Sequence, residues 1–265
     1  MNKQPSKSNN PLPEPRPSRA RRKASSWDCM DCIVIEEQER LELRETDEVP
    51  DKYWQEGWTF DINGIHRRDF DVDQDARYHR VYPTRYVVPN FKVTRSMRRV
   101  LARNRDLKIV TRSLRITPAK EDLFLAHHLQ RFGYEPESTL NERHKYQLCH
   151  QVQLMEMCYF VNDTLIAFNI FERGAYSLWS NIGVWSPAHW RRGLGTLTIL
   201  KEIEYARAND MLYYYMGNYW PGNPDYEYKT RFQPMELWDW DEKCWQPWGD
   251  WITNAMLTEK LRRRS

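Results

Sequence analysis

The chain has 265 residues, of which 40% are hydrophobic, so it is long enough for one large domain or two small ones with buried cores. A formal net charge of only +3 excludes a chain that is basic throughout, so the distribution of charge matters more than its sum. Five cysteines without a secretory leader argue against a secreted disulfide scaffold, and the lack of a long apolar run argues against a membrane span. We therefore expect a cytoplasmic protein with no membrane partner.

The amino-terminal region predicts a tail followed by a small domain. Residues 1–26 are rich in Pro, Ser, Asn and Arg, which is typical of a disordered basic tail. Cys29 and Cys32 have the spacing of half a metal site. A short helix is predicted over residues 50–57, because an acidic start and a terminal glycine bound it. The pair Asn63–Gly64 predicts a hairpin turn.

The next segment is rich in positive charge and almost free of acidic residues. Between Lys92 and Arg115 nine residues are Lys or Arg, and only Asp106 is acidic. Met97 and the apolar residues one turn later predict the buried side of a helix. Guanidinium groups would then cover its outer face and suit a phosphate backbone, although an ordinary exposed helix is the alternative. The residues of that predicted surface are Arg95, Arg98, Arg99 and Arg103.

The second half alternates helices and strands, which predicts an α/β (α+β) fold. Pro118 opens a helix that runs to Phe132, and Thr139 with Glu142 forms a capping box for the next helix. Asn162–Asp163 predicts a hairpin turn between two apolar runs. Strands are predicted over 154–161, 164–172, 175–185 and 211–216, and an amphipathic helix over 191–209. We place a domain boundary near residue 115, which gives domains over 27–115 and 116–265.

The stretch "WRRGLGT", residues 190–196, lies where a predicted strand leads into this long helix. Gly193 and Gly195 allow a tight turn, so that backbone N–H groups at the helix start can face a phosphate or a developing oxyanion. Two arginines before the glycines add positive charge. We therefore predict a role in catalysis for Gly195, and in substrate binding for Arg191, Arg192, Gly193 and Thr196.

The segment "YYYMGNYWPGNPDYEYKTRFQP", residues 213–234, surrounds two cations with aromatic rings, glycines and prolines. The alternation of Tyr213 and Tyr215 fits core or cross-strand packing as well as a binding role. The residues after the strand favour binding, because aromatic faces stack on unpaired bases and cations hold phosphates. These residues are Tyr219, Tyr228, Lys229 and Arg231.

These two segments, together with "YVVPNFKVTRSMRRVLARNRDL" upstream, resemble the aminoacyl-tRNA–protein transferases. That family includes arginyl-transferring eukaryotic enzymes and leucyl-transferring bacterial relatives. The resemblance covers most of residues 27–237 and implies an acetyltransferase-like (GNAT) catalytic domain with a smaller N-terminal domain. It implies transfer of an amino acid from aminoacyl-tRNA to the exposed N-terminal α-amine of target proteins, which marks them for degradation. It also suggests Tyr215, Lys229 and Gly195 as catalytic residues.

The sequence departs from the family pattern in several places, among them Asn223 for a usual Cys, Asn218 for a usual aromatic residue and Gly193 for a usual Ser. The family's second cysteine pair is missing, since Tyr78 and Val81 stand near its position. Two ligands do not complete a tetrahedral site, so we expect neither zinc nor an iron–sulfur cluster as cofactor. Ser186–Pro187 stands where the relatives have Asp–Pro, which suggests altered specificity or reduced activity.

Two other functions stay open from the sequence. A glycine-rich turn into a helix also suits an acetyl-CoA-dependent N-acetyltransferase, and the absent family residues suit a non-catalytic tRNA- or RNA-binding descendant. The basic helix and the segment after the last tyrosine-rich strand favour the aminoacyl-tRNA function. That interpretation requires Gly195 and Lys229 to lie on the same side of the molecule. The Trp-rich carboxy-terminal segment is predicted to be an annex of the catalytic domain.

Overall fold

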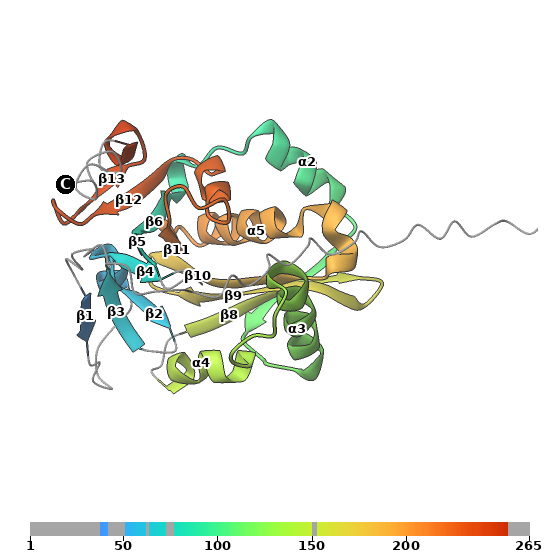
Figure 1. The fold of residues 1–265 in the computed structure, drawn as a ribbon. Helices are drawn as coiled ribbons and strands as arrows, with labels where there is room; N and C mark the ends of the chain where they lie inside the picture. The colour runs from blue at the N-terminus through green and yellow to red at the C-terminus, as the bar shows by residue number, and fades with distance from the viewer. Residues whose placement is uncertain (1–37, 42–50, 62–63, 73–76, 150–152, 254–265) are drawn as a thin grey trace, which may run out of the picture.

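The computed structural model describes residues 38–41, 51–61, 64–72, 77–149 and 153–253. One mixed sheet with the strand order β13-β12-β6-β11-β10-β9-β8-β7 forms its centre (Figure 1). The pair β10–β11 is parallel, and the other neighbours in this sheet are antiparallel. The strands are β6 (Tyr82–Val87), β7 (Lys108–Ser113), β8 (Gln153–Val161), β9 (Thr164–Arg173), β10 (Ser177–Trp185), β11 (Tyr213–Tyr219), β12 (Met235–Asp239) and β13 (Cys244–Pro247).

Helices cover both faces of this sheet. α5 (Leu194–Ala208) lies on one face with α2 (Arg95–Arg103) outside it, and α3 (Pro118–Phe132) and α4 (Leu140–Cys149) lie on the other (Figure 1). Because both faces are covered, the central strand β9 is buried from Ile166 to Phe171 with no polar face to solvent. The chain is therefore an α/β protein, as the alternation of its predicted elements indicated.

Smaller elements precede and connect these. α1 (Asp51–Gln55) follows β1 (Gln38–Leu41). A second sheet has the order β1-β3-β2, with β3 at Gly64–Arg68 and β2 at Thr59–Asp61. β4 (Phe70–Val72) pairs with β5 (Tyr78–Arg80). Three 3₁₀ turns are η1 (Val88–Asn90), η2 (Pro187–Arg192) and η3 (Glu227–Arg231).

A buried carboxylate fastens α1 to the central sheet. Asp51 accepts hydrogen bonds from the Ser177 hydroxyl and the Ala175 N–H, at the turn between β9 and β10. A Cβ atom at Gly174 would collide with this carboxylate, so glycine there permits the close approach of α1. The amino-terminal elements thus pack directly on the sheet.

The local predictions are confirmed where the structure describes them. α3 has the predicted bounds, and the capping box forms, with Glu142 N–H donating to Thr139 Oγ1 at 3.2 Å and Thr139 N–H to Glu142 Oε2 at 2.8 Å. Asn162 and Asp163 take positive φ values of 46° and 61°, as a two-residue hairpin turn requires. β2 and β3 pair as predicted, although Asn63 lies outside the described residues.

The sheet crosses the predicted boundary near residue 115. β6 and β7 precede that boundary, yet both pair with strands that follow it, because their partners are far away in the sequence. The predicted tail over residues 1–26 and the half-site of Cys29 and Cys32 lie outside the described residues, so the expectation about cofactors stays a prediction. Among the described helices, none has the length and apolar character needed to cross a membrane.

Candidate active site

The candidate site lies where two neighbouring strands separate. β10 and β11 pair in parallel from Ser177–Tyr213 to Trp179–Tyr215, and no further. Beyond that point β10 continues against β9 and β11 against β6, each with an irregular register. Because parallel strands end at the same edge of a sheet, the glycine turn after β10 and the segment after β11 both emerge there.

The glycine turn places the start of α5 at this edge. Gly193 has a φ of 69°, in the left-handed region that glycine tolerates, and its N–H donates to Trp190 O at 3.2 Å. The Leu197 N–H closes the first helical turn on Gly193 O. The N–H groups of residues 194–196 have no acceptor within the helix, as in the first turn of any α-helix, so they are suited to bind an anion.

Gly195 has a different reason to be glycine from the one predicted. Its φ is not positive, and a Cβ atom there would lie 2.9 Å from Cη2 of the Trp185 indole. The turn therefore depends on Gly193, while Gly195 lets the indole pack against the helix start. His127 also contacts this tryptophan, with Nδ1 3.1 Å from Trp185 O. Burial lowers the pKa of His127 to about 4, so this imidazole is neutral at physiological pH.

Hydrogen bonds tie the glycine turn to α2. The Arg192 guanidinium forms two bonds with the Asp106 carboxylate, at 2.9 and 2.8 Å. Asn104 Nδ2 donates to Arg192 O at 2.9 Å, and Arg103 Nη1 donates to Arg191 O. Two of the predicted phosphate ligands, Arg192 and Arg103, thus form hydrogen bonds with other groups of the protein, although Arg103 is exposed. Arg191 is exposed, with its guanidinium 4.9 Å from the exposed Trp190 ring, and Thr196 is half-buried.

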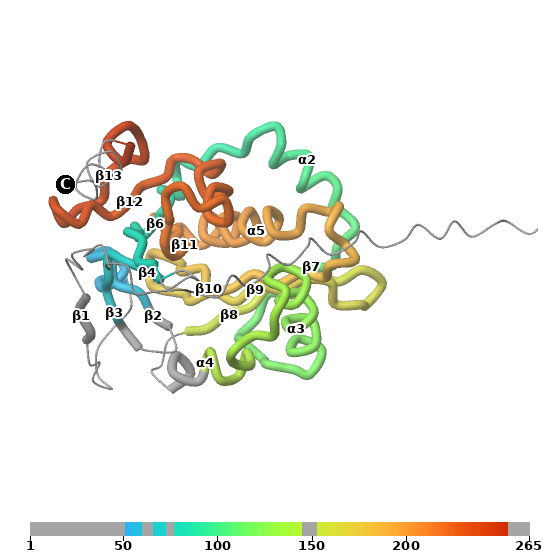
Figure 2. The backbone as a smooth tube through the Cα atoms, viewed as in Figure 1, coloured from blue at the N-terminus to red at the C-terminus, as the bar shows by residue number. Residues whose placement is uncertain are grey.

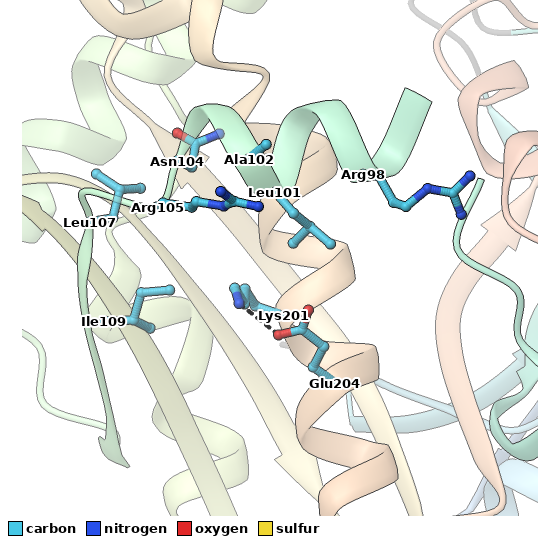
Figure 3. A pocket seen from close by; sticks show the side chains of 9 residues that line it. All are labelled: Arg98, Leu101, Ala102, Asn104, Arg105, Leu107, Ile109, Lys201 and Glu204. Atoms are coloured by element: carbon cyan, nitrogen blue, oxygen red, sulfur yellow. Dashed lines mark hydrogen bonds and ion pairs between the residues drawn. The ribbon is translucent and has the colours of Figure 1, made fainter. Parts of the chain in front are cut away.

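The outer face of α2 is basic, as predicted. Arg95, Arg98 and Arg99 are exposed, whereas Met97 is buried against the core. A cavity of about 390 Å³ lies between α2, β7 and α5 (Figure 3). Figure 3 shows side chains of α2 facing the Lys201–Glu204 ion pair across this cavity. The residues that line it are Arg98, Leu101, Ala102, Asn104, Arg105, Leu107, Ile109, Lys201 and Glu204.

Lys229 does not face solvent, where a phosphate could reach it. Its side chain is buried, and Nζ donates to Met216 O at 2.6 Å and to Asn218 O. These carbonyls flank Gly217, whose φ is 63°, in the irregular part of β11. Burial lowers the pKa of Lys229 to about 7. The lysine thus braces the bend of β11, and Tyr86 Oη donates to Lys229 O at 3.0 Å. Figure 2 shows the trace running on from β11 to β12, which pairs with β6.

Tyr215 belongs to an aromatic cluster and does not reach the glycine turn. Its ring is buried and stacks on Trp179, with the centroids 5.7 Å apart. Trp54 of α1 packs 5.9 Å from both rings, so the cluster joins α1 to the sheet. Burial raises the pKa of the Tyr215 phenol well above its usual value. Packing, which the alternation of tyrosines also allowed, explains this residue.

The remaining predicted residues lie on or near η3. Tyr219 is buried and its hydroxyl donates to Glu227 Oε1 at 3.0 Å. Tyr228 is half-buried against the main core, and Arg231 is exposed. The turn into α5 and η3 thus follow strands that end at the same edge of the sheet, while Tyr215 and Lys229 are buried among packing and hydrogen-bond partners. Their catalytic roles stay predictions.

The sequence analysis did not predict a buried carboxylate near the point where β10 and β11 separate. Glu202 of α5 is 1% exposed and accepts hydrogen bonds from Asn169 Nδ2 and the Tyr214 hydroxyl, both at 2.6 Å. Burial raises the pKa of Glu202 to about 7, although these hydrogen bonds oppose the shift. The sequence did hold a signal, because Glu202 lies within the apolar stripe that Ile199 and Ala206 form.

Residues 119–239 match the sequence family described as "Arginine-tRNA-protein transferase, C terminus". The aspartate/glutamate leucyltransferase of Leptospira interrogans is 29% identical over 159 residues, which cover 57% of this chain and 62% of that protein. The one from Parvibaculum lavamentivorans is 31% identical over 167 residues, covering 57% of this chain and 64% of that protein. The chain thus spans less than two thirds of the length of these two relatives.

Solved structures that match share little sequence. L-PGS from Bacillus licheniformis is 9% identical with a TM-score of 0.40, over 56% of this chain and 50% of that one. A tandem GNAT protein from the clavulanic acid biosynthesis pathway is 14% identical with a TM-score of 0.38, over 57% of this chain and 49% of that one. The sequence matches are the stronger likeness: residues 119–239 resemble the carboxy-terminal region of the arginine-tRNA-protein transferases.

Proposed function

We propose that the chain transfers an amino acid from an aminoacyl-tRNA to the N-terminal α-amine of a protein. The observation that carries this proposal is that β10 and β11 stop pairing after Trp179–Tyr215, with the turn into α5 following one strand and η3 following the other at the same edge of the sheet. Helix N–H groups suit the oxyanion that forms at the ester carbonyl. Exposed Trp190 and Arg191 beside them suit an unpaired nucleotide.

The reaction needs positioning more than strong acid–base chemistry. The amine nitrogen attacks the ester carbonyl, an amide bond forms, the ester C–O bond breaks, and the tRNA hydroxyl leaves with a proton. An α-amine has an ordinary pKa of about 7.7–8.0, so a useful fraction is neutral near pH 7. The neutral, buried His127 and the packed Trp185 keep the helix start in place.

The donor and the acceptor follow from the names of the relatives. Those relatives are named for leucyl transfer to aspartate or glutamate, and the sequence family is named for arginine-tRNA. We therefore propose an acceptor with an acidic first residue and either leucine or arginine as the transferred group.

The decisive experiment supplies one donor at a time. The full chain is incubated with leucyl-tRNA, arginyl-tRNA or acetyl-CoA, and with peptides that begin with Asp, Glu or Lys, and the products are identified by mass. We expect a mass increase of one aminoacyl residue on the Asp and Glu peptides. Acetylated peptides would support the acetyltransferase alternative, and binding of tRNA without any product would support a non-catalytic RNA-binding protein.

The exposed arginines of α2 are proposed to hold the phosphates of the tRNA. The test changes Arg95, Arg98 and Arg99 together to Gln. A plot of the logarithm of the tRNA association constant against the logarithm of the salt concentration should become less steep, by about 0.7–0.9 for each phosphate that is no longer neutralised. The measurement is tRNA binding at several salt concentrations. Lys52→Gln, an exposed cation on α1, should leave the slope unchanged, and an unchanged slope in the triple variant would place the RNA elsewhere.

A further inference from the structure

A guanidinium at the end of α3 lies at the candidate site, on the side away from α2. Arg131 is exposed, one residue before the end of α3, and Gly133 caps the helix with a φ of 80°. The Arg131 Cζ lies 5.4 Å from the centre of the Phe132 ring and 5.9 Å from that of Trp185. Trp185 is the indole that packs against the start of α5. Arg131 therefore stands beside the proposed oxyanion site.

Arg131 also faces the segment after β11. Burial raises the pKa values of Tyr226 and Tyr228, and the positive charge of Arg131 opposes both shifts, so the guanidinium lies within electrostatic reach of η3. Two acidic groups on this side are already bonded elsewhere, since Asp71 pairs with Arg68 and Glu227 accepts from Tyr219. In the part of the chain that the structure describes, no carboxylate forms an ion pair with Arg131.

The two faces of the sheet suggest separate approaches for the two substrates. The basic helix α2 and α5 lie on one face and α3 lies on the other, while η2, which leads into α5, contacts α3 (Figure 1). If the tRNA occupies the α2 side, the acceptor protein must reach the ester carbonyl from the α3 side. A planar guanidinium binds a carboxylate through two parallel hydrogen bonds, which suits an acidic side chain next to the attacking amine.

We infer that Arg131 binds the side-chain carboxylate of the acceptor's first residue and so selects proteins that begin with Asp or Glu. This inference rests on the proposed function and assigns its acceptor specificity to one residue. Arg131 positions the acceptor, while the helix N–H groups act on the reacting carbonyl.

The test compares charged and neutral acceptors of the same shape. For the unmodified chain, kcat/KM should be higher for a peptide that begins with Asp than for the same peptide beginning with Asn. In Arg131→Gln this preference should fall by about 10- to 100-fold, mainly through KM, because the variant cannot form the charge-assisted hydrogen-bonded pair. In Arg131→Glu the preference should shift toward peptides that begin with Lys or Arg.

A matched control is Arg143→Gln. Arg143 also lies over a phenylalanine, 5.5 Å from the Phe124 ring, but on α4, and its replacement should leave the preference unchanged. An unaltered Asp-to-Asn ratio in Arg131→Gln overturns the inference. The inference is also overturned if Arg131→Gln lowers kcat/KM equally for both peptides and weakens tRNA binding. Arg131 would then be assigned to the RNA.

Peptide binding without tRNA separates this inference from the proposed function. Calorimetric titration should show tighter binding of the Asp peptide than of the Asn peptide, and Arg131→Gln should remove the difference. If that result is obtained while no donor is transferred, the proposed function fails and the acceptor site stands. Equal binding of both peptides to the unmodified chain contradicts the acceptor site, whatever is transferred.

Discussion

Lys229→Met is expected to lower the free energy of unfolding by about 2–4 kcal/mol at about pH 10, because two buried carbonyls lose their donor. Near pH 8 the cost of removing the lysine's proton on folding offsets most of this difference. These are Met216 O and Asn218 O, which flank the bend of β11. Methionine fills most of the lysine's volume, so the change in packing adds little. Transfer should fall about 100-fold, since a displacement of about 1 Å at a reacting site has that effect.

The pH dependence identifies the cause. Burial lowers the pKa of Lys229 from 10.5 to about 7 in the folded protein. Between these values the unfolded chain binds more protons, so the folded protein gains stability as the pH rises, by up to about 1.4 kcal/mol per pH unit. Below pH 7 both states hold the proton and the contribution is constant. Lys229→Met lacks this slope, so the difference between the two proteins should widen from pH 7 to pH 10.

Urea denaturation at several pH values between 7 and 10 measures this difference. Lys108→Met is the matched control, because the Lys108 side chain is 69% exposed and pairs only with the exposed Asp163. Its stability should follow that of the unmodified chain at every pH. If the free energies of unfolding of Lys229→Met and the unmodified chain differ by the same amount at every pH, burial does not govern the charge of Lys229.

Local signals predicted the elements well, because their causes lie within a few residues. Pro118 begins α3, Thr139 and Glu142 cap α4, and Asn162–Asp163 turns between β8 and β9. Each of these is a bond or a dihedral preference between near neighbours. The turn into α5 was found for the same reason, since Gly193 adopts the positive φ that the pattern indicated.

Side-chain roles at the site depended on contacts between distant residues, which the sequence does not display. Arg192 looked free for a phosphate until Asp106 was found 2.8 Å away, across 86 positions of sequence. Lys229 looked like a ligand until the bend of β11 supplied its acceptors. Tyr215 could be assigned only once the parallel register placed it beside Trp179. Each of these roles depends on which distant segments lie side by side. That arrangement follows from the order of the strands in the sheet, which the sequence alone did not reveal.

Glu202→Gln is expected to make the folded protein more stable at pH 8, by about 3 kcal/mol. Burial raises the pKa of Glu202 from 4.5 to about 7. Between these values the folded protein binds more protons than the unfolded chain, so stability decreases as the pH rises from 4.5 to 7. Glutamine does not titrate, and it can still accept from Asn169 and bond to Tyr214. The gain should therefore vanish below pH 4.5 and be complete above pH 7.

Chemical denaturation between pH 4 and pH 8 measures this gain, and Glu204→Gln is the matched control on the same helix. The Glu204 side chain is 48% exposed and pairs with Lys201, so its replacement should change stability little at any pH. A Glu202→Gln protein that is less stable at pH 8 would contradict the raised pKa. If it is more stable but transfers more slowly, then packing does not explain why a carboxylate occupies this position. The reaction would then require the negative charge of Glu202, which acts on Tyr228 after β11.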